Sequence, residues 1–262
     1  MSKIKENKLL VILVLFSIML ISFGVILYSS HNVTAKGIYF RKTYGYIGCS
    51  KSQILVLDLT LFNVGDEDMV FFDDTDNLSF DIEAVVVKDI AVKSINKIRN
   101  IEVFQCIIKI DVLIYDKVQI KKIKYETDDY VKLYDLGCID LEKIDKESQA
   151  INHGANSDFL NNQYIFTLSS SNTESYTITD IMFSNNRINS INKNFPVNYE
   201  KGKTIEIKIG IEYDVDKFDV FILKPVLKFK KLDDTDDYYL FIVVQTRYEL
   251  PMTYKEIRDY LL

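Results

Sequence analysis

The sequence has little of what catalysis and metal binding usually require. It contains only two histidines, His31 and His153, and neither has a cysteine, aspartate or second histidine at metal-ligand spacing. The Gly-x-Ser-x-Gly, His-Glu-x-x-His and glycine-rich phosphate-binding motifs are all absent. A serine or cysteine nucleophile would have only His153 as a base. We therefore predict a protein that is not an enzyme, with no catalytic residues, no metal ligands and no cofactor.

Cysteine is scarce as well. The three residues Cys49, Cys106 and Cys138 are too few, and odd in number, for a fold held together by disulfides. Cys106 falls on the apolar face of an alternating segment, which predicts a buried thiol. Cys49 and Cys138 each follow a glycine at an expected strand end. Free thiols are the favoured state for these two, and a Cys49–Cys138 disulfide formed outside the cell is the alternative.

Positive charge is not concentrated anywhere along the chain. The formal net charge is −6 and no long basic stretch occurs, which argues against a nucleic-acid partner. Only 3 prolines and 9 glycines are present, whereas isoleucine, lysine and asparagine are abundant. This bias is typical of an AT-rich genome, such as that of a low-GC bacterium. Residues 37–262 are enough for one large domain or two ordinary ones.

One segment has no charge at all, and it predicts a membrane anchor. From Leu9 to Tyr28, fifteen of twenty residues are leucine, isoleucine, valine or phenylalanine. A helix of this length spans about 30 Å, the thickness of the hydrocarbon core of a bilayer. We expect a cytoplasmic tail at 1–8, a transmembrane signal anchor at 9–28 and a stalk at 29–36. The alternative is a signal peptide cleaved after Ala35.

The charges that flank this segment bear on its orientation. Three lysines precede it with one opposing glutamate, and three basic residues follow it within fifteen positions, so the count is tied. The short amino-terminal tail and the long following domain favour export of the carboxy-terminal part. We therefore expect a single-pass protein of the cell membrane, in contact with the bilayer through residues 9–28, with residues 37–262 extracellular.

Beyond the stalk, apolar and polar residues alternate with a period of two, as in half-buried β-strands. The clearest runs are residues 54–62, 104–114 and 205–213, each with an aliphatic ladder opposite charged or polar residues. Further strands are expected at residues 37–42, 79–88, 118–125, 130–136, 163–168, 175–183, 218–229 and 238–248. A pattern of this kind predicts a mainly β protein whose sheets each have one face in water.

About a dozen strands are more than one seven-stranded sandwich uses, so two Ig-like antiparallel β-sandwiches are expected. We place the first at 37–145, a polar linker at 146–162, and the second at 163–262. Thr253 and Glu256 have the spacing of a capping box, which predicts a short helix at the carboxyl end. We expect this helix to pack on the second sandwich. A role in binding a partner is the alternative.

The segment ILVLDLTLFNVGDEDMV, which follows Gln53, resembles the second-strand signature of bacterial surface Ig-like domains, including the DUF4352 type. Such domains often follow a membrane or lipid anchor. A second phrase, from Phe195 to Ile205, is similar to a strand–turn–strand of other Ig-like modules. The resemblance implies an anchored extracellular Ig-like fold, and it implies no site residues.

Two groups of side chains are candidates for binding. Acidic residues cluster in expected turns, where a solvated hairpin tip is the favoured interpretation and a weak extracellular calcium site is the alternative. These residues are Asp66, Glu67, Asp68, Asp73, Asp74, Asp76, Asp233, Asp234, Asp236 and Asp237. Four tyrosines could anchor a protein or glycan partner, although packing on a core is favoured. They are Tyr238, Tyr239, Tyr248 and Tyr254.

The combined features predict a non-enzymatic, membrane-anchored extracellular module that binds a protein or a cell-wall component. The anchor, the strand periodicity and the lack of catalytic motifs all favour this interpretation. The first alternative is an accessory subunit of a membrane transport or secretion complex. A further alternative is an extracellular enzyme of a type that the motifs do not reveal.

Overall fold

The computed structural model describes residues 16–22, 36–65, 75–146, 153–158, 163–168, 175–183, 185–191, 194–214, 216–231, 234–241 and 246–261. Residues 16–22 are helical, and their large apolar side chains are exposed. The rest of the expected anchor, the tail and most of the stalk lie outside the described residues. Within the described part of the chain, no helix is long and apolar enough to cross a membrane.

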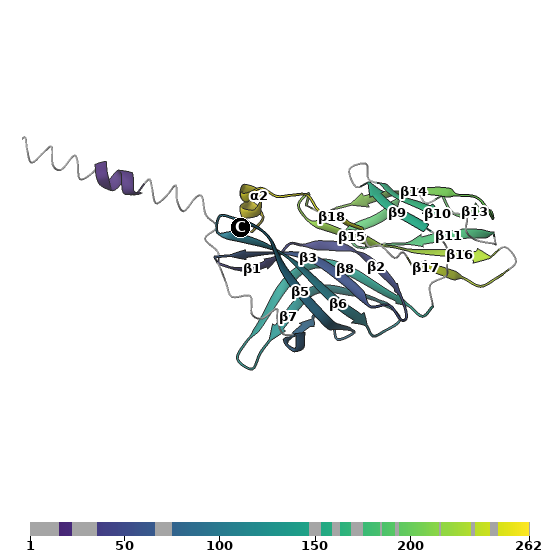
Figure 1. Ribbon diagram of the computed structural model, residues 1–262, viewed down its shortest axis with the longest axis horizontal. Helices are drawn as coiled ribbons and strands as arrows, with labels where there is room; N and C mark the ends of the chain where they lie inside the picture. The colour runs from purple at the N-terminus through teal and green to yellow at the C-terminus, as the bar shows by residue number, and fades with distance from the viewer. Residues whose placement is uncertain are drawn as a thin grey trace, which may run out of the picture.

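The prediction of a mainly β protein is confirmed, with four sheets and a short helix near the carboxyl end (Figure 1). The outer sheet has the strand order β1 (Gly37–Phe40), β3 (Leu55–Val64), β6 (Ile101–Val112) and β5 (Val85–Ile98). The central sheet has the order β18 (Thr246–Tyr248), β15 (Val220–Lys224), β2 (Thr43–Ser50), β8 (Val131–Ile144), β7 (Lys117–Glu126) and β4 (Leu78–Phe80). The 3₁₀ turn η2 (Thr75–Asn77) leads into β4.

The other two sheets come from the second half of the chain. The third sheet has the order β12 (Ile188–Ile191), β14 (Ile205–Tyr213), β10 (Gln163–Leu168) and β9 (His153–Asp158). The fourth has the order β13 (Val197–Tyr199), β11 (Tyr176–Met182), β16 (Val226–Lys231) and β17 (Tyr238–Phe241). Helix α2 (Tyr254–Leu261) ends the described chain.

Alternation in the sequence places the buried side chains. In β3, Leu55, Leu57, Leu59 and Leu61 all lie in the core between the outer and central sheets. In β14, Ile207, Ile209 and Ile211 lie in the core of the second half of the molecule. Burying one such aliphatic side chain contributes about 1.5–3 kcal/mol, so these ladders are a main source of stability.

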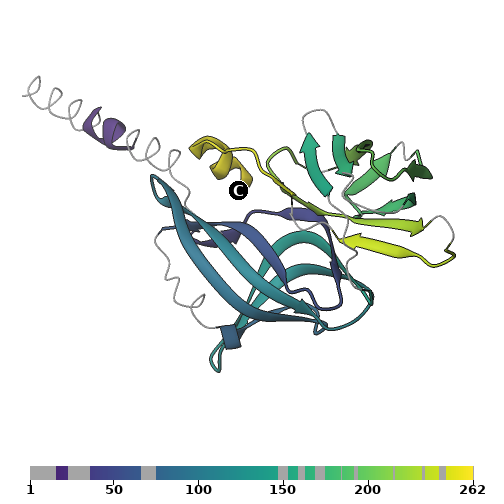
Figure 2. The same cartoon turned by 45° about the vertical axis from the view of Figure 1, so that its right-hand side comes forward.

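The central sheet belongs to both cores. Strand β15 pairs in parallel with β2, which itself pairs in parallel with β8. From these strands, Ile47 and Ile222 face the first core, whereas Tyr46 and Phe221 face the second. Two views show the sheets of the second half lying against the β2–β15 side of the first (Figures 1 and 2).

This sheet departs from the arrangement of two separate antiparallel sandwiches at 37–145 and 163–262. Strands β15 and β18 come from the second range, yet they are hydrogen-bonded into the sheet that closes the first core. The β2–β8 and β2–β15 pairs are also parallel and not antiparallel. Periodicity could not show this, because it reports which residues are buried and not which strands pair.

Two glycines allow the close approach of these three strands. A Cβ atom added to Gly45 of β2 would lie 1.9 Å from the carbonyl oxygen of Ile222 in β15. Gly137 of β8 has φ of +93°, and a Cβ there would lie 2.6 Å from the carbonyl oxygen of Thr43. Larger residues at either position would push the parallel strands apart.

Two further expectations about elements need correction. The expected linker at 146–162 contains strand β9, which pairs with β10 along six residues. Its sequence, HGANSD, has no apolar ladder, so alternation could not predict it as a strand. The expected strand at 218–229 is divided at Pro225 into β15 and β16, which join different sheets.

The capping box is confirmed, because the Glu256 carboxylate accepts hydrogen bonds from the Thr253 backbone N–H and hydroxyl, both at 2.8 Å. The expected position of the helix was wrong. Ile257 of α2 packs with Phe62, Val64 and Ile101 on the outer sheet of the first core, not on the second sandwich. The chain reaches this position because β18 runs along the edge of the central sheet.

The cysteines are all buried and free. The prediction for Cys106 is confirmed, since it is fully buried in the first core. Cys138 pairs with Tyr44, whereas Cys49 pairs with Lys143 five positions further along β8. At about 3.3 Å per residue the two cysteines are too far apart for a disulfide.

A buried asparagine attaches the second half of the molecule to the central sheet. The Asn185 side-chain amide donates to the carbonyl oxygens of Gly45 and Cys138 and to Asp140 Oδ2, each at 3.1 Å. Its own Oδ1 accepts the backbone N–H of Arg187 at 3.0 Å. One side chain therefore links strands β2 and β8 to the segment that precedes β12.

We predict that Asn185→Ala lowers the free energy of unfolding by about 1–3 kcal/mol, because buried acceptors lose their donor. Urea unfolding followed by circular dichroism measures this change. The exposed neighbour provides the control, and Asn186→Ala should have an effect within about 0.5 kcal/mol. Equal effects of the two substitutions would show that these hydrogen bonds do not stabilise the interface.

Candidate functional site

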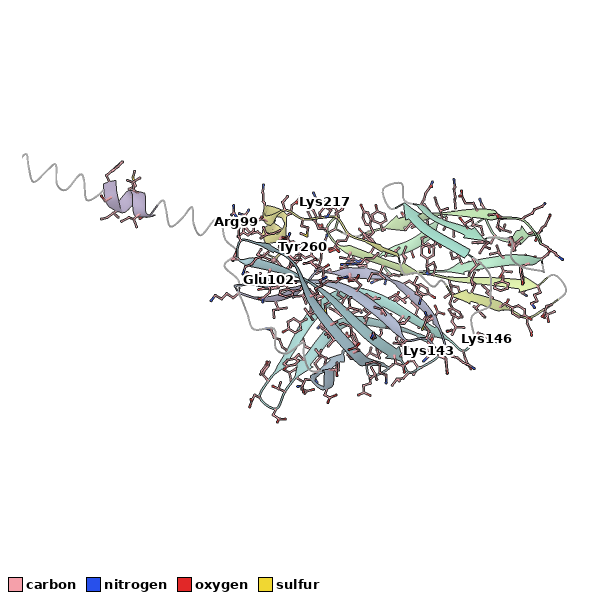
Figure 3. All side chains as sticks on the ribbon, in the orientation of Figure 1. Arg99, Glu102, Lys143, Lys146, Lys217 and Tyr260 are labelled. Carbon is pink, nitrogen blue, oxygen red and sulfur yellow. The ribbon has the colours of Figure 1, made fainter. Side chains whose placement is uncertain are left out.

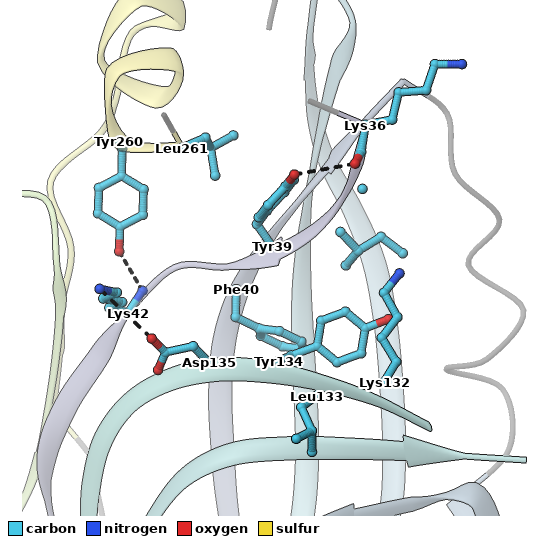
Figure 4. A pocket seen from close by; sticks show the side chains of 12 residues that line it. Lys36, Tyr39, Phe40, Lys42, Lys132, Leu133, Tyr134, Asp135, Tyr260 and Leu261 are labelled. Carbon is cyan, nitrogen blue, oxygen red and sulfur yellow. Dashed lines mark hydrogen bonds and ion pairs between the residues drawn. The ribbon is translucent and has the colours of Figure 1, made fainter. Parts of the chain in front are cut away.

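A cleft of about 390 Å³ opens at the end of the first sandwich where the described domain begins (Figure 4). Its walls come from three segments that are far apart in sequence: strand β1 with the preceding Lys36, the beginning of β8, and the end of α2. The lining side chains are Lys36, Ile38, Tyr39, Phe40, Lys42, Lys132, Leu133, Tyr134, Asp135, Tyr260 and Leu261. We call this the β1–α2 cleft.

The floor of the cleft is aromatic. The rings of Phe40 and Tyr134 meet edge to face with centroids 5.7 Å apart. The amino group of Lys132 lies 5.3 Å from the centroid of the Tyr134 ring. Beside them Leu133 is 56% exposed, much like Val131 of the same strand at 53%. The floor therefore offers apolar surface together with positive charge.

The α2 side of the cleft is fixed by hydrogen bonds of Tyr260. Its hydroxyl accepts the backbone N–H of Lys42 at 2.7 Å and donates to Asp219 Oδ1 at 3.1 Å. Burial raises the pKa of Tyr260, so the hydroxyl stays protonated at physiological pH. Burial also raises the pKa of Asp219, although the Tyr260 hydrogen bond opposes that change. Figure 4 shows Tyr260 pointing to the start of β2.

A charged network beneath β18 holds this part of the chain in place. Arg41 is only 2% exposed, and it donates to Glu249 and to the carbonyl oxygens of Phe218 and Leu250. Arg247 forms an ion pair with Asp58 at 3.2 Å. Because each buried charge has a partner, this network positions the segment that leads into α2.

The described lining of the β1–α2 cleft combines apolar and aromatic surface with lysines and one carboxylate. Asp135 is the single carboxylate among the lining residues, and Lys42 lies 4.0 Å from it. No histidine or cysteine lines the cleft. Apolar and aromatic surface with a lysine rim fits an apolar group that stands next to a negative charge.

A second chemical feature lies at the opposite end of the first sandwich, around Lys143 (Figure 3). Cys49, Lys143 and Lys224, here called the lysine–cysteine cluster, are all buried on the central sheet. Burial raises the pKa of the Cys49 thiol to about 11 even though both lysines oppose it. Burial lowers the pKa of Lys224. This combination of a thiol and amines in a core is not explained by packing alone.

The residues singled out from the sequence lie elsewhere. Asp234 accepts hydrogen bonds from the Asp236 backbone N–H and the Tyr238 hydroxyl, and Asp237 pairs with Lys228 at 2.8 Å. Most of the other clustered acids lie outside the described residues, as does His31. Within the described ranges, no group of three or more histidine, cysteine, aspartate or glutamate side chains is placed to hold a metal ion.

The tyrosines behave as the core interpretation predicts. Tyr238, Tyr239 and Tyr248 pack against the second core, and Tyr254, the first residue of α2, packs against the small core between α2 and the outer sheet. His153 belongs to β9 in the third sheet. The β1–α2 cleft could not be predicted from the sequence, because its walls come from three segments that are far apart along the chain. The one available signal was Leu133, an apolar residue between lysine and tyrosine near a strand end.

Comparison with known proteins does not assign this chain to a family. No protein-family model and no curated protein sequence matches it. A crystal structure of a protein of unknown function from Porphyromonas gingivalis W83 is similar over 81% of this chain and 99% of its own, with 7% identity and a TM-score of 0.26. A structure named BspA_C_WT covers 79% of this chain and 96% of its own, with 6% identity and a TM-score of 0.18. Neither similarity is high enough to transfer a fold or a function.

We predict that Lys224→Met stabilises the protein at pH 7 by roughly 1–4 kcal/mol, because the Lys224 ammonium need no longer be buried on folding. The measurement is made with a thiol reductant, which keeps the cysteines as free thiols. The folded-state pKa of Lys224 is lowered, so the unfolded state binds more protons between that value and 10.5. Wild-type stability therefore rises with pH across this window, and the advantage of the variant shrinks towards pH 10.

Urea unfolding at pH 7 and pH 10 measures both effects. Lys121→Met is the matched control, because Lys121 is exposed on β7 and its removal should change stability little at either pH. An advantage of Lys224→Met that is equal at the two pH values would contradict the ionisation argument and leave only a packing effect.

Proposed function

We propose that this protein is a non-enzymatic, membrane-anchored extracellular module that binds a protein partner through the β1–α2 cleft. The observation that carries the proposal is the exposed Leu133 on an aromatic floor beside lysine side chains. Apolar anchors with a charged rim are the usual composition of a protein-binding surface. The cleft also lacks the carboxylate pair, histidine or thiol that an enzyme site would use.

The position of the cleft supports a partner at or near the membrane. Lys36 lines the cleft, and only seven residues separate it from the end of the uncharged segment at Tyr28. Seven extended residues span at most about 25 Å. An anchor at residues 9–28 would thus hold the cleft close to the bilayer surface, within reach of another membrane protein or an inner cell-wall component.

We further propose that the two halves of the molecule are Ig-like sandwiches that share the central sheet. Sheet-on-sheet packing around two cores supports it, as does the resemblance of the β3 phrase to bacterial surface Ig-like domains. Ig-like sandwiches have their loops clustered at the ends of the strands, where binding surfaces can form.

An accessory subunit of a membrane transport or secretion complex is the second candidate. The same observation favours it, because a cleft held near the bilayer faces whatever membrane protein stands beside the anchor. The two candidates differ in stoichiometry: a subunit copurifies in a fixed ratio with its complex, whereas a surface-binding module does not.

We predict that protease added to intact cells removes residues 37–262 while a cytosolic control protein survives. The flanking basic charges are tied, and the short amino-terminal tail with the long following domain favours this orientation. Immunoblotting with an antibody against the carboxy-terminal half measures the loss. Protection of the domain until the cells are lysed would reverse the orientation.

We also predict that Leu133→Asp abolishes copurification of the partner from detergent extracts, because a carboxylate would replace the apolar anchor of the cleft. Ile191→Asp is the matched control, since Ile191 is similarly exposed but belongs to β12 in the second half. Circular dichroism should show that both variants fold. Equal retention of the partner by both variants would exclude the cleft as the docking site.

A further inference from the structure

The lysine–cysteine cluster is built by the parallel pairing of the central sheet. In the register, Lys224 of β15 lies opposite Ile47 of β2, and Lys143 of β8 lies opposite Cys49. Residues that pair directly point to the same face of a sheet, as do residues two apart in one strand. Cys49, Lys143 and Lys224 therefore all point into the first core, with the thiol between the two lysines.

The two lysines differ in how their charges are satisfied. The Lys143 amino group forms an ion pair with Asp111 at 3.2 Å and donates to the carbonyl oxygen of Val112 at 2.7 Å. Lys224 is only 4% exposed, and no residue in the described part of the chain forms an ion pair or hydrogen bond with it. Among the described side chains, the Lys224 amino group is not one of the fully enclosed polar atoms that lack a partner, so it keeps some contact with solvent. Burial of most of the side chain still lowers its pKa and favours the neutral amine.

The nearby acids do not offer Lys224 a partner. Asp111 is already paired with Lys143. Glu142 accepts the Tyr46 hydroxyl at 2.7 Å, and Tyr46 faces the second core. The neighbouring group that interacts electrostatically with Lys224 is the Cys49 thiol. Both groups are desolvated, which favours the neutral amine and the neutral thiol side by side.

We infer that Cys49 and Lys224 form a covalent N–O–S crosslink when the protein is exposed to dioxygen. The thiol and the amine together reduce one dioxygen molecule: R–SH + R′–NH₂ + O₂ → R–S–O–NH–R′ + H₂O. The S–H bond, one N–H bond and the O–O bond are broken, and an S–O bond and an O–N bond form. The second oxygen atom leaves as water, with the hydrogen of the thiol and one hydrogen of the amine.

The crosslink would explain the cluster. It removes the ionisable amine and the thiol from the core at the same time, so the cost of burying Lys224 disappears. It also joins β2 to β15 covalently, across the contact that connects the two halves of the chain. The crosslink requires dioxygen and the geometry of the central sheet. Its formation does not depend on what the β1–α2 cleft binds.

The other two cysteines serve as internal controls. Cys106 lies between Leu59 and Val92 on the neighbouring strands, so no amine stands beside it. Cys138 lies opposite Tyr44 and is contacted by the Asn185 amide, which is not a comparable nucleophile. Lys117 and Lys121 also act on its thiol, but both are exposed on β7, unlike the buried Lys224. Both should remain as free thiols under the conditions in which Cys49 reacts.

The test uses the full-length chain, purified in air without reductant, unfolded in guanidinium and treated with N-ethylmaleimide. We expect label on Cys106 and Cys138 but not on Cys49, and label on all three after dithiothreitol. Trypsin does not cleave before proline, so Lys224 stays inside the peptide 218–228 whether or not it is linked. Mass spectrometry should find this peptide joined to peptide 43–51, heavier than their sum by one oxygen and lighter by two hydrogens.

Variants separate the outcomes. Lys224→Met should restore labelling of Cys49 in the unreduced protein, whereas Lys121→Met should not. Full labelling of all three cysteines without reductant would overturn the inference. So would a blocked Cys49 that is joined to Cys106 or Cys138, or oxidised without attachment to residues 218–228. Because the main measurement is made on the wild-type chain, a variant that fails to fold does not obscure the result.

Discussion

The parallel pairing of β2 with both β8 and β15 is the contact on which the rest of the molecule depends. It gives one sheet two buried faces, with Ile47 and Ile222 in one core and Tyr46 and Phe221 in the other. It also directs β18 along the sheet edge, from which α2 reaches the outer sheet. The β1–α2 cleft and the lysine–cysteine cluster stand at opposite ends of the sandwich that this sheet closes (Figure 3).

Alternating segments could be recognised from the sequence because their burial is one-sided. Strands β3, β6, β10 and β14 therefore lie close to their expected ranges. A strand end was expected at Cys49, but no range was predicted for β2, because its sequence, TYGYIGCS, is largely buried on both faces and shows no alternation. Strand β9 was missed because its polar sequence, HGANSD, has no apolar residues in alternation. Pairing across 177 positions, as between Thr43 and Val220, leaves no local signal at all.

Neither candidate site could have been derived from sequence spacing. The cleft joins Lys36, Leu133 and Tyr260, and the cluster joins Cys49 to Lys224, so each depends on the register of distant strands. The sequence drew attention instead to acids in turns, which periodicity and composition make conspicuous. A buried lysine cannot be told from an exposed one until the strand on either side of it is known.

The shared sheet also sets the order in which the chain can fold. Strand β15 begins at Val220, so the first core stays open on one side until most of the chain has been made. A chain that crosses a membrane from its amino end would present β2 without β15, its neighbour on one side, for much of that passage. Contacts of such long range slow folding and expose unpaired strand edges, so assistance from chaperones on the far side of the membrane would suit this topology.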